Sequence, residues 1–179
     1  MKDNAEIKSR FKPSLLYGVL AGYIIVFVLS PVIQYLGGLI IAADGIHLSF
    51  EYYKFTCELV VSPISGKIVS ILVLLIPSII SIVNIEINSH LLTKVTMGFF
   101  RNFFIVYQLV LIGYLLVNVF IGAVSIVLDL SLGNEYAQII SGVLGFTMPV
   151  SFLLILVMLI ILTGYINITT RRITKYINI

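Results

Sequence analysis

Residues 102–128 read NFFIVYQLVLIGYLLVNVFIGAVSIVL, a run of twenty-seven residues without a charged side chain. A bilayer core about 30 Å thick is crossed by about 20 helical residues, so this run is long enough to span a membrane once. The run is continuously apolar, whereas the strands of a membrane barrel alternate in segments of about ten residues. This stretch therefore predicts a transmembrane helix.

Three further apolar runs in the chain have the same character, and we expect four transmembrane helices over residues 15–43, 64–87, 102–128 and 137–166. The first run is about twice as long as the apolar part of a signal peptide, so we expect it to be retained as a span. The expected fold is an all-α, polytopic helical bundle in which residues 1–179 form a single integral-membrane domain.

The overall composition agrees with a membrane protein. The chain is 60% hydrophobic and 11% charged, with a mean hydropathy of +1.14. Soluble domains are about 45–50% apolar and about 25% charged, and disordered chains are more polar still. The net charge of +3 comes from cations at the ends of the apolar runs, which is not the pattern of a nucleic-acid groove. The first expected partner is therefore the lipid bilayer, with no nucleic acid.

The distribution of Lys and Arg predicts the orientation. In a four-span arrangement, the two termini and the middle connection share one side of the membrane. That side carries Lys2, Lys8, Arg10, Lys12, Lys94, Arg101, Arg171, Arg172 and Lys175, and the other side carries Lys54 and Lys67. Because cytoplasmic loops are enriched in Lys and Arg, we expect a multi-pass protein of the cell (plasma or inner) membrane with both termini in the cytoplasm.

The first outer connection has room for structure of its own. From Ser49 onward, apolar residues recur at helical spacing, namely Phe50, Tyr53, Cys57, Val60 and Val61. Three charged residues, Glu51, Lys54 and Glu58, fall together on another helical face. This pattern predicts an amphipathic helix that serves either as a plain surface connector or as an external docking element.

Small residues suggest where helices approach closely. Gly18 and Gly22 form a GxxxG pattern in the first span, and Ala137, Ser141 and Gly145 recur at every fourth position in the fourth. Such spacing places small residues on one helix face. We expect them to pack within the bundle, with self-dimerisation as the alternative.

Polar residues inside the spans are uncharged. Gln34, Gln108 and Asn118 are expected to form interhelical hydrogen bonds, and the alternative is a polar pore or ligand contact. No Asp, Glu, Lys, Arg or His lies at the centre of a run, which argues against proton-coupled transport.

Pro31, Pro77 and Pro149 are expected to kink three of the spans, because each removes a backbone donor.

No residue is predicted to be catalytic, to bind a cofactor or to ligate a metal. The single cysteine, Cys57, excludes an internal disulfide, and His47 and His90 lie in different connections. We therefore expect that the protein is not an enzyme.

Two classes of function remain. The first is a non-catalytic membrane protein that acts through its helix faces and outer segment on another membrane protein or an inserted toxin. In size, number of spans and orientation, the chain resembles immunity proteins of pore-forming bacteriocins, and the resemblance is one of architecture. An accessory subunit of a larger complex fits equally well. The alternative is an oligomeric small transporter or channel for a neutral or hydrophobic solute, which would need self-association.

Overall fold

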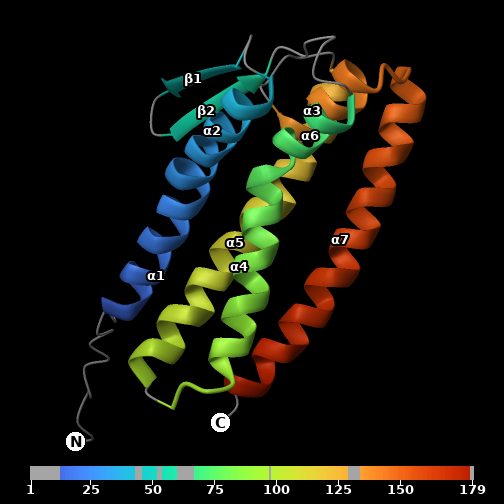
Figure 1. The fold of residues 1–179 in the computed structure, drawn as a ribbon. Helices are drawn as coiled ribbons and strands as arrows, with labels where there is room; N and C mark the ends of the chain where they lie inside the picture. The colour runs from blue at the N-terminus through green and yellow to red at the C-terminus, as the bar shows by residue number, and fades with distance from the viewer. Residues whose placement is uncertain are drawn as a thin grey trace, which may run out of the picture.

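The computed structural model describes residues 13–42, 46–51, 54–59, 67–96, 98–128 and 134–177, and these residues are mostly helical (Figure 1). The helices are α1 (Pro13–Tyr23), α2 (Ser30–Ala42), α3 (Lys67–Leu74), α4 (Ile76–Leu92), α5 (Gly98–Val127), α6 (Glu135–Ala137) and α7 (Met148–Ile177). The other elements are two π-helical segments, η1 (Ile24–Leu29) and η2 (Gln138–Val143), and two strands, β1 (Ile46–Glu51) and β2 (Lys54–Leu59).

Three helical stretches are long and apolar enough to cross a membrane, namely Pro13–Ile40, Gly98–Val127 and Met148–Thr174. The first of them joins α1, η1 and α2. The pair α3 and α4 is bent by 54° and adds a fourth crossing if the pair is counted as one span. The described part of the chain is therefore a mostly helical bundle with three to four candidate membrane-spanning helices, which agrees with the sequence at that level of detail.

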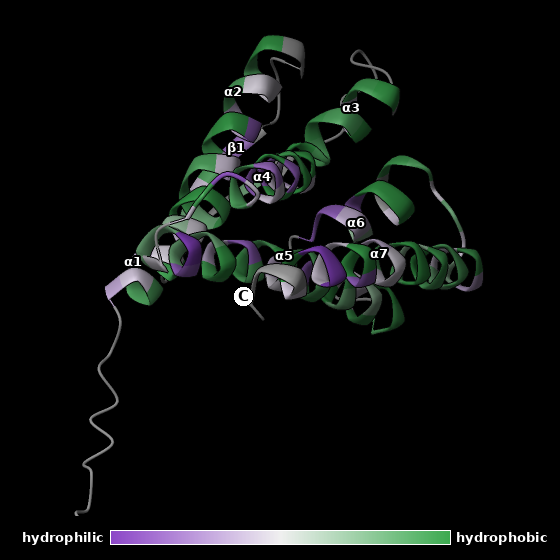
Figure 2. Ribbon diagram, turned by 90° about the horizontal axis from the view of Figure 1, so that it is seen from below, coloured by the Kyte–Doolittle hydropathy of each residue, from purple (hydrophilic) through white to green (hydrophobic). Residues whose placement is uncertain are grey.

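The long helix α5 is central to the bundle, because it packs against α1, α4 and α7. Leu111 and Leu115, on its buried side, are 0% and 1% exposed. In Figure 1 the start of α1 and the end of α7 lie at the same end of the bundle, and the hairpin of β1 and β2 lies toward the other end. Figure 2 shows that hydrophobic residues cover α3 and most of α7.

Residues 46–51 and 54–59 form two paired antiparallel strands, so the amphipathic helix predicted from Ser49 onward is wrong over these residues. The hairpin register pairs apolar with apolar residues, such as Leu48 with Cys57, and polar with polar residues, such as His47 with Glu58. Both strands contact α2, and Cys57 is buried at 8% exposure in a core with Leu74. The segments IHLSFE and KFTCEL alternate at every second residue, which favours strands. Of the apolar residues that suggested a helix, Phe50 and Cys57 belong to this alternating set.

Pro77 and Pro149 lie at helix starts, whereas Pro31 lies inside the continuous helical stretch Pro13–Ile40. Pro31 is the second residue of α2 and follows η1, where the Ser30 hydroxyl donates a 2.7 Å hydrogen bond to the carbonyl oxygen of Ile25. Pro77 lies in the first turn of α4, next to the 54° bend. Pro149 is the second residue of α7, where a missing N–H costs little. The expected kink in the second span is present as a break between two helices, whereas Pro149 does not interrupt a helix.

The fourth predicted span, residues 137–166, has the wrong boundaries. The candidate span runs over Met148–Thr174, and residues 135–143 form the short segment of α6 and η2 before it. Gly145 has a φ of 67°, a conformation that favours glycine and that stops the helical run between η2 and α7. The sequence is uncharged across this turn, which is why hydropathy alone joins the two pieces.

Candidate functional site

A polar cluster joins α4, α5 and α6. We call it the Glu135 cluster, and it consists of Ser78, Tyr114, Asn118, Asn134, Glu135 and Tyr136. Asn134 precedes α6 and caps it, because its Oδ1 accepts hydrogen bonds from the backbone N–H groups of Tyr136 at 3.0 Å and Ala137 at 3.2 Å. Its Nδ2 donates to the backbone carbonyl of Asn118 at 2.8 Å and to the Asn118 side chain at 2.7 Å. The start of α6 is thereby tied to α5.

Close approach of Asn134 to α5 depends on Gly122. A Cβ atom at Gly122 would lie 2.7 Å from Asn134 Oδ1 and 3.2 Å from Tyr136 Cβ. Only glycine leaves room for the capping amide at this position of α5. Neither Gly122 nor Asn134 is among the residues predicted from the sequence to form a site. The Asn134–Glu135 pair before an apolar run is a helix-start signal that would have indicated the cap.

The Glu135 carboxylate is held by hydroxyl groups. Tyr114 Oη donates to Glu135 Oε1 at 2.9 Å, and Ser78 Oγ lies 3.4 Å from Glu135 Oε2. Ser78 Oγ is also 2.7 Å from Tyr136 Oη, and Asn118 Nδ2 donates to Tyr114 Oη at 3.3 Å. Among the described residues, no Lys or Arg pairs with this carboxylate. Glu135 therefore contributes a carboxyl group that is solvated by neutral donors.

Glu135 lies outside the four apolar runs of the sequence, but its carboxylate contacts Tyr114, which lies near the middle of α5. The physical reason is that α6 begins beside Asn118 and not beyond the end of α5. Hydropathy along the chain carries no information about this placement.

Burial raises the pKa of the Glu135 carboxyl to about 7, although the hydrogen bonds from Tyr114, Asn118 and Ser78 lower it. Glu135 belongs to α6, outside the candidate spans.

A second polar cluster links α4 to α5 nearer the chain termini. Asn88 Nδ2 donates to Gln108 Oε1 at 2.9 Å and to the backbone carbonyl of Phe104 at 2.8 Å. Gln108 Nε2 donates to Ser89 Oγ at 2.8 Å. Asn88 and Gln108 are 2% and 0% exposed. Gln108 and Asn118, both singled out in the sequence, thus bond to α4 and to the Asn134 cap of α6, respectively. Gln34 is buried on α2, and its Nε2 atom has no hydrogen-bond partner among the described residues.

The glycines of the first span face α5. A Cβ atom at Gly18 would lie 2.7 Å from the carbonyl oxygen of Phe103, and one at Gly22 would lie 2.6 Å from Val110 Cγ1. Both glycines are buried. These contacts lie inside the bundle, between α1 and α5, as the sequence analysis expects.

The second set of small residues is arranged differently. Ser141 is exposed and its hydroxyl donates to the carbonyl of Ala137, whereas a Cβ atom at Gly145 would meet nothing within 4 Å. Ala137, Ser141 and Gly145 therefore do not form a helix-packing stripe. The helical spacing between them is lost at η2 and at the turn around Gly145.

Those outer-segment residues that the structure describes lie on the two strands of the hairpin. Phe50 is 63% exposed on β1, and Cys57 is buried on β2. For Glu51, Lys54 and Glu58 the structure describes the backbone, in which Glu51 pairs with Lys54 across the hairpin. Tyr53, Val60 and Val61 lie outside the described residues.

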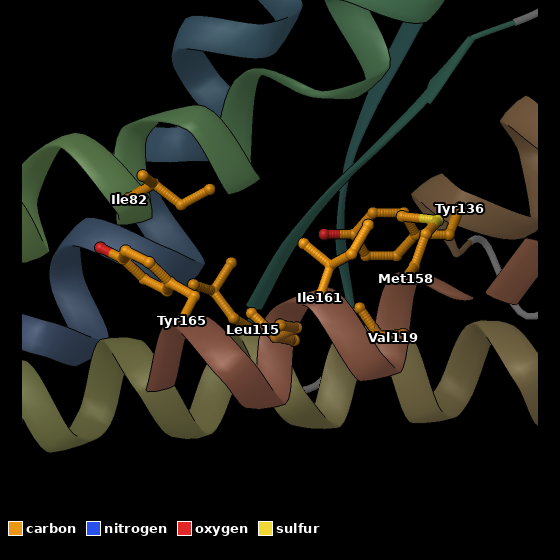
Figure 3. Close-up of a pocket in the computed structure, with 8 residues that line it drawn as sticks. Ile82, Leu115, Val119, Tyr136, Met158, Ile161 and Tyr165 are labelled. Atoms are coloured by element: carbon orange, nitrogen blue, oxygen red, sulfur yellow. The ribbon is translucent and has the colours of Figure 1, made fainter. Parts of the chain in front are cut away.

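An apolar groove of about 310 Å³ runs between α4, α5 and α7 (Figure 3). It is lined by Ile82, Leu115, Val119, Tyr136, Met158, Ile161, Leu162 and Tyr165. Tyr136 and Tyr165 lie at opposite ends of it in Figure 3. Ile161 is 66% exposed, so the groove opens to the outside of the bundle along α7. Its size suits a small ligand, and its lining offers such a ligand mainly apolar contacts.

An exposed ion pair lies beyond the Tyr165 end of the groove. Glu86 on α4 accepts a 2.9 Å hydrogen bond from Tyr165 Oη through Oε1 and pairs with Arg172 Nη1 at 3.1 Å through Oε2. The neighbouring Arg171 donates from Nε to the neutral Asn167 side chain at 3.1 Å. Arg172 and Glu86 remain about half exposed. The Tyr165 end of the groove is therefore linked through Glu86 to Arg172.

The fold and these clusters define a helical protein with several helices apolar enough for a membrane. No family model, no curated protein and no solved structure matches the chain. Its function is therefore argued from its own residues.

Proposed function

We propose that the protein is a non-catalytic integral membrane protein that acts through helix contacts with another membrane protein or with an inserted toxin. The observation that carries this proposal is the uncovered surface of α7. Only 11% of the residues in an apolar 18-residue stretch of α7 are buried, compared with 33% in α5 and 28% in the first span. Leu153 and Ile160 on this helix are 62% and 73% exposed. We define the α7 outer face by Leu153, Val157, Ile160 and Ile168.

The polar clusters support this proposal. Gln108 and Asn118 are bonded to side chains of neighbouring elements, and each bond ties α5 to another part of the bundle. Polar groups that satisfy one another in this way hold a scaffold in place. The spacing of the outer-face residues, at four, three and eight positions, places them on one side of α7. A second helix can pack along such a side.

The proposed setting is the cell (plasma or inner) membrane, with four crossings and both termini in the cytoplasm. The charge distribution of the sequence supports this orientation. The start of α1 and the end of α7 lie at the same end of the bundle, which fits an even number of crossings. An immunity protein or an accessory subunit would both fit this arrangement.

Co-purification from a mild detergent tests the proposal. Contact with a membrane partner predicts a stoichiometric second protein, which is lost when Leu153 and Ile160 are both changed to Asn. The matched control is Val117→Asn with Phe120→Asn, on the exposed side of α5. Membrane abundance of each variant is measured by blotting. Recovery of a pure oligomer, unchanged by the α7 variant, would contradict the proposal.

The second candidate is an oligomeric transporter or channel for a neutral or hydrophobic solute. Two observations favour it, namely the apolar groove and the carboxyl group of Glu135 against the middle of α5. The carboxyl group removes one argument against proton-coupled transport. Solute flux into proteoliposomes that is lost in Glu135→Gln, while the variant remains folded, would favour this candidate over the contact protein.

A further inference from the structure

The groove between α4, α5 and α7 has two chemically different ends. Its body is lined by aliphatic side chains such as Leu115 and Leu162. At one end, Tyr165 reaches Glu86, and Glu86 in turn reaches Arg172. Seven residues of helix separate Tyr165 from Arg172, which corresponds to about 10 Å along α7. A ligand that fills the groove and reaches this end must combine an apolar tail with a polar head.

The charge at that end favours an anionic head. Arg171 and Arg172 contribute two cations, and Glu86 contributes one anion. A guanidinium group has five N–H donors, and the contact of Arg172 with Glu86 occupies one of its nitrogens. The remaining donors suit the oxygens of a phosphate group. Basic sites between transmembrane helices are a recurring way to bind phospholipid headgroups.

We propose that the groove holds one acyl chain of an anionic phospholipid and that Arg172, assisted by the charge of Arg171, binds its phosphate. The groove is reached from the side of the bundle, because Ile161 lines it and is largely exposed. In a membrane, a bilayer lipid can enter from that side without leaving the lipid phase. The proposal does not depend on a protein partner or on the orientation of the chain.

Substitution of Glu86 distinguishes lipid binding by Arg172 from a purely structural ion pair between these two residues. If Arg172 only stabilises the fold through its ion pair with Glu86, removal of either charge should have the same effect. If Arg172 binds a phosphate, Glu86 competes with that phosphate for the guanidinium group. Glu86→Gln should then strengthen binding of an anionic lipid, and Arg172→Gln should weaken it.

The experiment is native mass spectrometry of the purified protein in micelles that contain equal amounts of phosphatidylglycerol and phosphatidylcholine. The protein should retain more phosphatidylglycerol than phosphatidylcholine. Arg172→Gln should lower that ratio about fivefold, the contribution of one cation near an anionic headgroup. Glu86→Gln should raise the ratio, and Lys94→Gln, which removes an exposed cation elsewhere, should leave it unchanged.

A second pair of variants tests the acyl chain. Ile161→Trp should lower the total amount of bound lipid by filling the groove. Ile160→Trp, at an exposed neighbour that does not line the groove, should not. Met158→Trp replaces Ile161→Trp if that variant does not purify as a folded protein. The proposal is overturned by an equal ratio of the two lipids, by shifts of the same sign in the Glu86 and Arg172 variants, or by equal effects of the two Trp variants.

Discussion

Gly122 is the residue that allows α6 to start against α5. Because a Cβ atom would lie 2.7 Å from Asn134 Oδ1, the capping amide must move if any other residue takes this position. The cap is the connection between α6 and Asn118, so its displacement affects the whole Glu135 cluster.

We therefore expect Gly122→Ala to destabilise the protein by about 1–3 kcal/mol, the usual range for overpacking with loss of a helix cap. Gly113→Ala is the matched control, since it lies in the same helix and its Cβ atom would meet nothing within 4 Å. That variant should be neutral or slightly stabilising, because alanine favours a helix over glycine. The measurement is the thermal transition in detergent. Equal transitions for the two variants would show that the close contact is absent.

The raised pKa of the Glu135 carboxyl group predicts how the stability of the protein depends on pH. Burial raises the pKa of this carboxyl to about 7, above its ordinary value in an unfolded chain. Between the two values the folded protein binds a proton that the unfolded chain has released, so stability falls as the pH rises. The thermal transition should therefore decrease from pH 5 to pH 8, and Glu135→Gln should remove most of this decrease. Glu86→Gln, at an exposed carboxyl, is the control and should keep it.

At the scale of single elements, the hairpin differs most from the sequence prediction. Leu48 and Cys57 are direct partners in the register, and the Cα atoms of such partners lie about 4.5–5.5 Å apart. That separation suits a disulfide. In a helix the same two residues, nine positions apart, would be about 13 Å apart.

Leu48→Cys should thus form an intramolecular disulfide with Cys57 under mild oxidation. Ser49→Cys should not, because neighbouring residues of a strand point to opposite faces. The product is detected as a loss of maleimide-reactive thiols in mass spectrometry. No crosslink in Leu48→Cys, or equal crosslinking in both variants, would contradict the hairpin.

The elements that the sequence predicts well are those that hydropathy defines. The third run, residues 102–128, nearly coincides with α5, and the glycines at 18 and 22 lie against this helix. What hydropathy misses is local backbone geometry. The turn at Gly145 lies in an uncharged stretch, so hydropathy gives no sign of it. Neither the position of α6 beside Asn118 nor the alternation within 46–51 and 54–59 is visible in hydropathy averaged along the chain.

Single polar residues of the candidate site could be predicted from the sequence, but their assembly into one cluster could not. Gln108 and Asn118 stand out as polar residues within an apolar run, and their hydrogen bonds fit that interpretation. Glu135 and Ser78 come from distant parts of the sequence, and no local pattern brings them together. The groove consists of ordinary apolar residues from four elements, which a single sequence cannot distinguish from core.

At the scale of the whole molecule, the orientation can be measured directly. Tags at the two ends of the chain should both report the cytoplasm. A cysteine in place of Thr147, which is exposed in the turn before α7, should react with a membrane-impermeant maleimide from outside in the variant that also carries Cys57→Ser. A C-terminal tag on the opposite side from the N-terminal tag would exclude an even number of spans.

The α7 outer face is the surface expected to contact a membrane partner, because α7 is the candidate span least covered by the rest of the bundle. Bundle-facing positions of α7, such as Ile155 at 0% exposure, are already occupied by internal contacts. A membrane partner should therefore meet the α7 outer face and not the opposite side of the helix.

Site-specific photo-crosslinking in the native membrane tests this claim most directly. A photoreactive amino acid at Ile160 should give a discrete protein adduct of constant size, whereas the same probe at Val117, an exposed position of α5, should give mainly lipid adducts. The Ile160 adduct should disappear when Leu153 is changed to Asn in the same chain. If Ile160 and Val117 both give only lipid adducts while the protein remains active in its cell, the α7 outer face is not a contact surface and the proposed function is wrong.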